Sequence, residues 1–460
     1  MPLSDPTPAA EQCMRIAPSG AARGDASMHN PLHVVIIGAG LGGLCLAQAL
    51  KRAGIAFDVY ERDPAIDSRL QGYRIRIDAA GQRALAACLP AGLDALFRAA
   101  AAQGAGGTRL VTPRLAPASA SPPAGWHTEL DTPDADSHAD LAVNRLTLRE
   151  ILMAGIEDRV HFAHAVDHYR LLPDGRAHVT FANGASGPVT GDVLVGADGI
   201  HSTIRAQLAP AAAPVDTGSV CLYGKTRLPD GGPASGLARA ALRDATTVIL
   251  ADGCAAILED MRFRTDLRAL AAQAIPHGRF TPPDDYFYWA VIGPRERLGL
   301  NDAGTPAALA ARLTDALRQV VRGWHPVLRH LLLDTPRSAI AALPVRSGRP
   351  GVPLPAGPVT LLGDAIHPMS PAGGAGANTA LRDAEALAAL LAKQAGGGSD
   401  VGHALTQYAA RMRVWATDAV AASARAAAWL FAGDDPETSN DPESVSIGVA
   451  ANPPKESGRA

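Results

Sequence analysis

The chain has little lysine. Only four lysines occur in its 460 residues, Lys51, Lys225, Lys393 and Lys455, so arginine carries most of the positive charge. The formal net charge is −3 and the isoelectric point is about 6.5. A nearly balanced chain of this kind offers no strongly basic surface to nucleic acid or to an anionic membrane. Composition therefore predicts neither of these partners.

Cysteine pairs and long apolar runs are also missing. The five cysteines lie far apart and form no CxxC pair, which argues against a zinc site or a disulfide framework and for reduced thiols in a cytoplasmic protein. No apolar run approaches the ~18 residues of a membrane-spanning helix, so we expect no stable membrane insertion. Residues 1–30 lack the apolar segment of a signal peptide, and we expect a disordered leader there and a disordered tail over 434–460.

The first ordered pattern begins at His33. The β-branched run HVVIIGAG predicts a strand, LGGLCLAQALKRAG predicts a helix that ends near Gly54, and IAFDVYERD predicts a second strand. A strand–helix–strand unit of about 30 residues implies parallel strands. Further along the chain, SVCLYGKTRL, TTVILADG and YFYWAVIG read as strands, residues 306–334 as one helical stretch, and residues 402–433 as a long helix or a broken pair.

A glycine-rich turn joins the first strand to the first helix. It reads Gly38-Ala39-Gly40-Leu41-Gly42-Gly43. The first glycine of such a turn permits the tight bend, the second lets a pyrophosphate approach, and the last lets helix pack on strand. Glu61 ends the second strand 18 residues after Gly43, where an acid holds a ribose hydroxyl. The pattern predicts an adenine dinucleotide, NAD or FAD. The alternative is a glycine-rich turn of another α/β protein with an incidental glutamate.

Two later segments share another pattern, a strand that runs into an aspartate and glycines. DVLVGADGIHSTIR places Asp198 after a strand, and GDAIHPMSPAGGAGANTALRDA places Asp364 after the strand Val359–Leu362. An aspartate at a strand end can accept a sugar hydroxyl while nearby backbone amides face phosphate. Either segment alone is more typical of a turn with a capping aspartate. Together with the glycine-rich turn, in this order, they favour a dinucleotide site.

The three motifs together resemble the single-component FAD-dependent aromatic hydroxylases. This is the para-hydroxybenzoate hydroxylase superfamily, which includes tetracycline-inactivating and antibiotic-tailoring monooxygenases. The resemblance covers roughly residues 33–110, 140–210 and 340–420 and leaves out the middle third of the chain. It implies an α/β fold, with a Rossmann-like FAD-binding domain, an inserted mixed-sheet substrate domain and C-terminal helices.

The resemblance also implies the residues around an extended FAD. Those near the pyrophosphate and adenosine would be Gly38, Gly40, Leu41, Gly42, Gly43, Glu61, Arg62 and Arg145, with Arg149 less certain. Asp198 is associated with both FAD and NAD(P)H binding. Gly363 and Asp364 would hold the ribityl or pyrophosphate region. The isoalloxazine edge would be lined by Pro371, Gly374, Ala375, Gly376 and Asn378.

The implied reaction uses NADPH or NADH and O₂ and passes through a flavin C4a-hydroperoxide. Its product would be an oxygenated, most simply hydroxylated, aromatic, polycyclic or polyketide-like small molecule. Because the cofactor carries the chemistry, no catalytic triad is required. The alternatives are a reductase or dehydrogenase of the same fold, a non-catalytic flavin-binding regulator, and a halogenase. The halogenase alternative is disfavoured because YFYWAVIGP lacks the GWxWxIP pattern and no lysine lies between Lys51 and Lys225.

Some residues have two interpretations. His367 could act as an acid–base group, but a histidine that fixes its loop by hydrogen bonding is the more common case. The aromatic run 286–289 could face a planar substrate, although core packing is favoured. The arginines that follow the second strand, Arg62, Arg69, Arg74 and Arg76, could recruit the phosphates of NAD(P)H or form a solvated or sheet-edge cluster.

Motifs and resemblance together predict the organisation of the chain. We expect a leader over 1–30, a first part of the FAD-binding domain with the start of a substrate segment over 31–110, and a loop insertion over 111–139. A second FAD-binding part spans 140–210, a substrate-binding domain 211–340, and a third FAD-binding part 341–400. A C-terminal helix over 401–433 and the tail over 434–460 complete the chain. The sequence does not indicate the number of subunits or a metal site.

Overall fold

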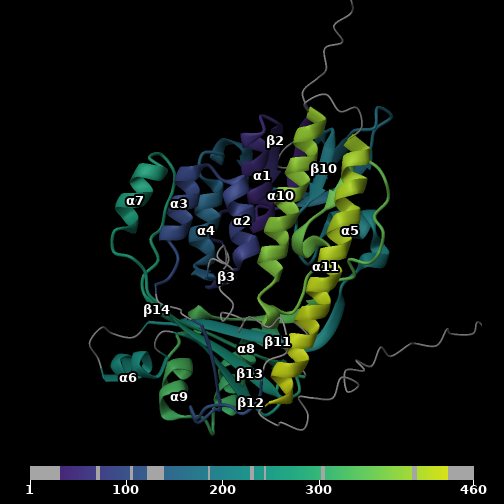
Figure 1. The fold of residues 1–460 in the computed structure, drawn as a ribbon. Helices are drawn as coiled ribbons and strands as arrows, with labels where there is room; N and C mark the ends of the chain where they lie inside the picture. The colour runs from purple at the N-terminus through teal and green to yellow at the C-terminus, as the bar shows by residue number, and fades with distance from the viewer. Residues whose placement is uncertain are drawn as a thin grey trace, which may run out of the picture. The chain divides into compact units, whose positions relative to one another are not determined.

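The computed structural model describes residues 32–68, 73–103, 107–121, 139–184, 187–227, 233–242, 245–301, 306–395 and 401–433. The expected leader and tail lie outside the described residues, as does most of the 111–139 insertion. Figure 1 shows two groups of elements, one of helices around β2 and β10 and one around β11, β13 and β14. The fold is α/β, as expected. The domain boundaries given above stay predictions.

The first group is built on a five-stranded parallel sheet. Its order is β16-β10-β1-β2-β6, and each adjacent pair of strands is parallel. Val34, Val35 and Ile36 have no exposed surface, as expected for a β-branched strand covered on both faces. The predicted parallel strand–helix–strand unit is confirmed. The strands are β1 (His33–Ile37), β2 (Ala56–Tyr60), β6 (Val160–His161), β10 (Val193–Gly196) and β16 (Val359–Leu361).

The order of this sheet brings the three sequence motifs together. β16, β10, β1 and β2 are neighbours, and the aspartates and glycines follow directly after their carboxyl ends. In open parallel sheets, ligands bind at this edge. Segments separated by more than 300 residues of sequence therefore face one region, since Gly38 and Asp364 both lie there.

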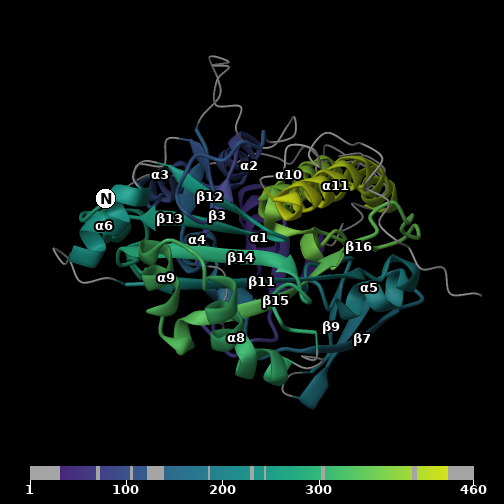
Figure 2. The ribbon, with the colours of Figure 1, turned by 90° about the horizontal axis from the view of Figure 1, so that it is seen from below.

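Helices cover this sheet. α10 packs against α1, α2 and α11, and Figure 2 shows α10 and α11 side by side. α11 is one continuous helix, which decides between the two interpretations of residues 402–433. The helices of this group are α1 (Leu41–Arg52), α2 (Ala79–Cys88), α3 (Ala91–Ala99), α4 (Arg145–Met153), α5 (Thr203–Leu208), α10 (Gly376–Ala395) and α11 (Val401–Ala432).

The second group is a six-stranded sheet in the order β15-β11-β14-β13-β12-β4. Its pairs are antiparallel except β12 with β4, which are parallel. The three strands predicted here are confirmed, whereas β13 was not predicted. Its strands are β4 (Thr108–Val111), β11 (Val215–Thr226), β12 (Thr246–Ala251), β13 (Cys254–Met261), β14 (Tyr286–Pro294) and β15 (Ile340–Ser347).

One face of this sheet packs on helices through a separate apolar cluster that includes Phe287 and Trp289. The single helical stretch predicted over 306–334 is wrong, because the chain forms two helices there. Pro326 begins the second, and His325 caps it through Nδ1, which accepts the Val327 N–H at 3.3 Å. The helices of this group are α6 (Pro233–Leu242), α8 (Pro306–Val320) and α9 (Pro326–Leu333), whereas α7 (Leu267–Ala274) packs on α3 of the first group.

Two small sheets complete the described secondary structure. β3 (Ile75–Ile77) pairs with β5 (Leu141–Val143), and β7 (Val166–Leu171), β8 (Ala177–Phe181) and β9 (Val189–Gly191) form an antiparallel unit. The segment that leads into β3 also contacts the six-stranded sheet. Among the helices that the structure describes, none is long and apolar enough to cross a membrane.

A carboxylate between two histidines gives the parallel sheet a pH-dependent stability. Asp58 accepts hydrogen bonds from the ring nitrogens of His33 at 2.9 Å and His161 at 3.0 Å. The bond to Asp58 raises the pKa of His33. Burial would raise the pKa of Asp58, but the two histidine bonds lower it overall. The His33 contribution is complete below about pH 6.5 and is lost as the pH rises through the raised folded pKa. The Asp58 contribution is lost as the pH falls below about 4.

We therefore expect Asp58→Asn to reduce stability most between about pH 4 and 6.5. Urea unfolding of the parent and the variant at pH 5.5 and pH 8.5 measures the effect. The matched control is Asp167→Asn, because Asp167 bonds to His168 in an exposed pair. If Asp58→Asn lowers the free energy of unfolding equally at both pH values, the stability contributed by Asp58 does not depend on histidine protonation.

Candidate functional site

The glycine-rich turn contains three glycines that pack against protein and one, Gly40, that faces open space. Gly38 has φ +110°, and a Cβ there would lie 2.3 Å from the Ala197 carbonyl oxygen. A Cβ on Gly43 would lie 2.1 Å from the Gly38 carbonyl oxygen. A Cβ on Gly40 would meet no atom within 4 Å, and its φ of −74° suits any residue. The space beside Gly40, at the N-terminus of α1, is therefore free for a ligand.

Leu41 and Gly42 form the buried start of α1. A Cβ on Gly42 would lie 2.7 Å from Leu362 Cδ1, so this glycine permits the helix to pack on the end of β16. Both residues would therefore serve a phosphate through backbone N–H groups and not through side chains.

Glu61 holds the glycine-rich turn from the end of β2. Only 8% of its surface is exposed, and its Oε2 accepts the Ala39 N–H at 2.8 Å while Oε1 accepts the Asp63 N–H at 3.0 Å. A carboxylate oxygen accepts more than one hydrogen bond, so Glu61 retains capacity for a ribose hydroxyl. Arg62, the next residue, is exposed.

Arg149 also fixes the turn. Its guanidinium donates to the Ala39 carbonyl from Nε at 3.1 Å and Nη2 at 2.9 Å, and to the Ile66 carbonyl from Nη1 at 2.6 Å. These bonds commit the side chain to the protein backbone, which accounts for the burial of a charged group. The geometry indicates that Arg149 shapes the site.

Asp198 caps a helix at the neighbouring strand end. Its Oδ2 accepts the N–H groups of Thr203 at 2.8 Å and Ile204 at 3.4 Å at the start of α5. Burial raises its pKa, although these backbone bonds oppose the rise. Asp198 thus has the role of a capping aspartate in a turn, the alternative given above. It also lies beside Gly38, because a Cβ on Gly38 would be 3.0 Å from the Asp198 Cα. It therefore borders the open turn.

The loop after β16 is organised by a buried carboxylate. Asp383 of α10 accepts the Gly363 N–H at 3.0 Å and the His367 Nε2 at 2.6 Å on Oδ2, and the Trp415 Nε1 at 2.8 Å on Oδ1. Burial by itself would lower the pKa of His367, but the charge and hydrogen bond of Asp383 raise it overall. Both side chains of the pair are fully buried. The geometry matches the loop-fixing interpretation of His367 and not the acid–base one.

Asp364 has a different environment from its neighbours. Its side chain is exposed, yet the surrounding protein raises its pKa by burial, an effect that the positive charges of His367 and Arg145 oppose. The side chain is therefore accessible although many protein atoms lie around it. Arg145, the first residue of α4, lies close enough for its positive charge to act on Asp364. That both residues contact the cofactor stays a prediction.

The segment Pro371–Gly376 is a floor with little side chain. Gly374 has φ +62°, and the nearest atom to a Cβ there would be Arg76 Cδ at 4.0 Å; for Gly376 it would be Met369 Cγ at 3.7 Å. The small residues, Ala375 among them, leave backbone as the surface that a flat ring would meet. No protein atom crowds the Cβ position of either glycine, so the backbone of the floor is accessible there.

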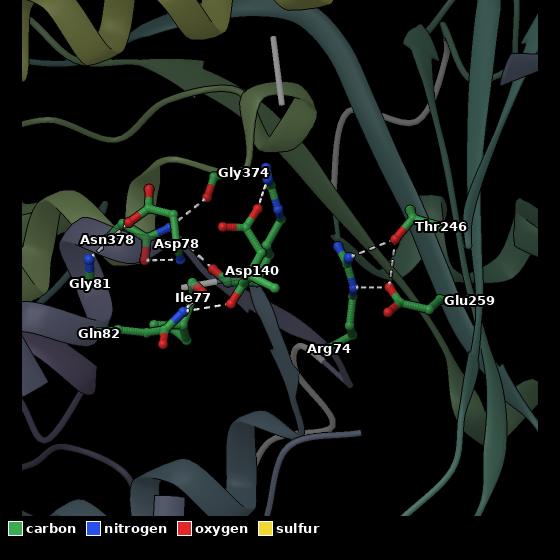
Figure 3. A network of polar contacts seen from close by, with 12 residues as sticks. Arg74, Ile77, Asp78, Gly81, Gln82, Asp140, Thr246, Glu259, Gly374 and Asn378 are labelled. Carbon is green, nitrogen blue, oxygen red and sulfur yellow. Dashed lines mark hydrogen bonds and ion pairs between the residues drawn. The ribbon is translucent and has the colours of Figure 1, made fainter. Parts of the chain in front are cut away.

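Asn378 ties this floor to β3. Its Oδ1 accepts the Asp78 N–H at 3.2 Å, and its Nδ2 donates to the carbonyls of Arg76 at 3.1 Å and Gly374 at 3.2 Å. Figure 3 shows Asn378 between Asp78 and Gly374. Its amide is thus bonded to backbone, so Asn378 positions the floor. That Asn378 also lines the isoalloxazine edge stays a prediction.

The segment 73–76 connects the floor to the six-stranded sheet. Arg74 Nε lies 2.5 Å from Glu259 Oε2, with Glu259 almost fully buried, and Arg74 Nη2 donates to Thr246 Oγ1 at 3.4 Å (Figure 3). Arg76 pairs with Asp140. Arg74 and Arg76 are thus engaged by carboxylates and do not form a solvated cluster, and Arg69 lies outside the described residues.

The aromatic run divides between the two faces of β14. Phe287 and Trp289 join the cluster under α8 and α9, where Trp289 Nε1 donates to Thr335 Oγ1 at 2.8 Å. Tyr286 is buried on the other face, where it donates to the Tyr73 carbonyl. Tyr288 also lies on that face, with the guanidinium of Arg74 5.8 Å from its ring centre. Tyr286, Phe287 and Trp289 are therefore core residues, and Tyr288 packs against the cluster that contains Tyr286. The structure favours core packing for this run.

These features define an FAD-binding α/β fold with an added mixed sheet, and comparison with known proteins agrees. The FAD binding domain family matches residues 31–219 and 318–423, more than half of the chain. The chain belongs to this family.

Several relatives are named as monooxygenases. The dual O-methyltransferase/FAD-dependent monooxygenase CTB3 of Cercospora beticola is 36% identical over 412 residues, which cover 83% of this chain and 44% of that protein. Aurachin C monooxygenase/isomerase of Stigmatella aurantiaca is 30% identical over 399 residues, or 86% of this chain and 89% of that one. The chain thus spans less than half of CTB3 and most of the aurachin enzyme.

The fold has a close solved counterpart. A candidate FAD-containing monooxygenase from Photorhabdus luminescens subsp. laumondii TTO1 superposes with a TM-score of 0.68 at 30% identity, over 86% of this chain and 97% of that one. The residues described above fit FAD: the open space at Gly40 suits a pyrophosphate, the exposed Asp364 suits a sugar-alcohol chain, and the floor at Gly374 and Gly376 suits a flat ring.

Sequence reasoning missed Asp383 as the organiser of the site. It lies inside the GDAIHPMSPAGGAGANTALRDA segment, at a position that reads as an ordinary helical residue. Only its helical spacing from Ala380 and Leu387, which are buried, signals that this carboxylate points into the core. Its partners Gly363 and Trp415 lie 20 and 32 residues away in sequence.

The floor assignment predicts that Gly376→Val lowers flavin occupancy before it lowers folding. The nearest protein atom to the new Cβ lies at 3.7 Å, an ordinary contact, so the added methyls would meet the cofactor and not the protein. We expect the purified variant to retain at most about a tenth of the parent's flavin, a loss of about 1.4 kcal/mol or more in binding. Absorbance at 450 nm and circular dichroism measure the two properties. Gly376→Ala is the matched control, and a Gly376→Val protein that stays yellow would refute the assignment.

Proposed function

We propose that this protein is an FAD-dependent monooxygenase that uses NADPH or NADH and O₂ to hydroxylate an aromatic or polyketide-like small molecule. The observation that supports this most is the convergence of Gly40, Asp364 and the floor at one edge of the parallel sheet. The names of CTB3 and of the aurachin C enzyme support the monooxygenase class and a small-molecule substrate.

In this proposal, bound FAD supplies the redox chemistry, accepting a hydride from NAD(P)H and activating O₂. The chain binds and orients it. The turn at Gly40 and the start of α1 direct backbone N–H groups to the pyrophosphate, and Glu61 and Asp364 accept sugar hydroxyls. The floor, held by Asn378 and Asp383, would support the ring. The six-stranded sheet, which segment 73–76 joins to the floor, would limit access of water.

The decisive experiment follows oxygen and reductant in the purified holoprotein. NADPH and NADH oxidation and O₂ uptake are measured with a panel of naphthols and hydroxylated anthraquinones, and products are analysed by mass spectrometry under ¹⁸O₂. A mass gain of one ¹⁸O atom supports the proposal. Equal turnover without oxygen would identify a reductase. Bound FAD that neither nucleotide reduces with any compound would identify a non-catalytic flavin protein.

A further inference from the structure

A cavity of about 230 Å³ lies between helix α11 and the proline-rich loop that precedes β16. The loop, residues 350–357, contributes three prolines to the lining, and α11 contributes residues between positions 405 and 413. None of the residues assigned above to the cofactor lines this cavity. The first residues of β16 line it, whereas Asp364 and the floor follow the carboxyl end of that strand. The cavity is therefore separate from the edge that would bind FAD.

The walls of the cavity are mostly apolar. Prolines, leucines, valines, alanines and a methionine form most of the lining. On α11, Leu405 and Met412 are buried. Tyr408, which lies between them in sequence, ties the helix to the strand, because its hydroxyl donates to the Leu361 carbonyl at 3.0 Å. A proline has a fixed φ, so a loop with three prolines loses little freedom when a ligand binds. The cavity therefore suits the apolar body of a small molecule.

A buried hydroxyl without a partner belongs to this lining. Thr360 is 1% exposed, and its Oγ1 has no hydrogen-bond partner among the described residues. Side chains alternate along extended backbone, so Thr360 points to the same face as Leu362, which contacts the start of α1 at Gly42. That face is covered by helices. A buried hydroxyl without a partner costs stability, and a polar atom of a ligand in this cavity would remove that cost.

A positive charge also belongs to the lining. Among the described residues that line the cavity, Arg413 alone is charged. It is exposed, and it enters no ion pair within the described part of the chain. The residues three and four positions away along α11 are alanines and a threonine, so no carboxylate of the same helix neutralises it. A guanidinium beside apolar walls is complementary to the carboxylate of an otherwise apolar molecule.

We propose that this cavity is a second small-molecule site, which binds a carboxylic acid with an apolar body and one further polar oxygen. The carboxylate would pair with Arg413, the body would lie between α11 and the loop 350–357, and the further oxygen would accept from the Thr360 hydroxyl. The volume of about 230 Å³ is below the ~300–1,000 Å³ of a drug-sized site, so the acid has about one ring. The inference goes beyond the proposed function and does not depend on it.

The test uses 4-methoxyphenylacetate, which has all three features, and 4-methoxyphenylacetamide, in which a neutral amide replaces the carboxylate. Ligand-observed NMR of the purified holoprotein, without NAD(P)H, measures the dissociation constants. The parent should bind the acid with a Kd at or below about 1 mM and at least about 5-fold more tightly than the amide. Arg413→Met should remove this preference. Ala409→Phe places a ring in the cavity and should abolish binding of both compounds.

The hydroxyl has its own test. Thr360→Val keeps the shape of the side chain and removes the donor, so it should weaken binding of 4-methoxyphenylacetate about 5-fold. Phenylacetate lacks the methoxy oxygen, and its affinity should not change in this variant. If Thr360→Val binds the methoxy acid like the parent, the hydroxyl is no contact and the proposed ligand class is wrong.

Matched variants of α11 separate this site from binding elsewhere. Arg411 and Gln407 are exposed residues outside the cavity lining, so Arg411→Met and Gln407→Phe should bind the acid like the parent. If the parent does not bind the acid, or if Arg413→Met and Ala409→Phe bind it like the parent, the inference is wrong even if the ¹⁸O₂ experiment succeeds. If no compound is oxygenated but acid binding is lost in those two variants, the proposed function fails and the second site stands.

Discussion

Gly40→Val is expected to give a folded protein that purifies almost without flavin. The backbone at Gly40 has φ −74°, which valine adopts, and no atom lies within 4 Å of the new Cβ. The folding cost should therefore stay within about 1 kcal/mol. The side chain would instead fill the space beside the N-terminus of α1, where a pyrophosphate would accept charge-assisted hydrogen bonds. Loss of two such bonds predicts FAD binding weaker by at least about 100-fold.

The neighbouring glycines provide the contrast for this prediction. A Cβ at Gly38 or Gly43 would lie 2.3 Å and 2.1 Å from backbone carbonyl oxygens, so alanine there should destabilise the fold itself. Urea unfolding and flavin titration of Gly38→Ala, Gly43→Ala and Gly40→Val separate the two effects. A Gly40→Val protein that binds FAD as tightly as the parent would place the cofactor elsewhere. A Gly40→Val protein that fails to fold would show that the open space is needed by the protein.

The parallel sheet could be predicted from the sequence because each of its signals comes from residues that are neighbours in the chain. A β-branched run, a glycine-rich turn and an amphipathic helix each follow from neighbouring residues, and the right-handed crossover then fixes the parallel pairing of β1 and β2. Parallel strands also end at one edge of their sheet, and ligands bind at that edge. The residues that follow the strands therefore meet there, namely Gly38, Glu61, Asp198 and Asp364. The cofactor site was accordingly predictable as a set of strand ends.

The residues that organise the site were not predictable in the same way. Arg149 was expected near the cofactor, yet its guanidinium donates to the Ala39 and Ile66 carbonyls, 110 and 83 residues away in sequence. Asn378 bonds to backbone groups of Arg76 and Asp78 about 300 residues away. No periodicity or motif reports such long-range pairing. β13 was missed for a related reason, since its burial depends on β12 and β14 on either side.

The largest effect on stability is expected at Asp383. Three donors, the Gly363 N–H, the His367 ring and the Trp415 indole, converge on its two oxygens. An asparagine offers one oxygen and one NH₂ group, so Asp383→Asn leaves at least one of these donors facing another donor. Removing the negative charge also leaves the buried His367 without its ion-pair partner. We expect the free energy of unfolding to fall by about 3 kcal/mol.

The pH dependence of that loss distinguishes an ion pair from a packing defect. In the parent protein the pKa of His367 is raised, so its pairing with Asp383 contributes fully below about pH 6.5 and is lost as the pH rises through the raised folded value. The stability gap between the parent and Asp383→Asn should therefore narrow from pH 6 to pH 9 in urea unfolding. Asp364→Asn is the matched comparison, because Asp364 is exposed and its loss should reduce flavin affinity with little effect on unfolding of the apoprotein. A gap that does not change with pH would mean that Asp383 acts through hydrogen bonds alone.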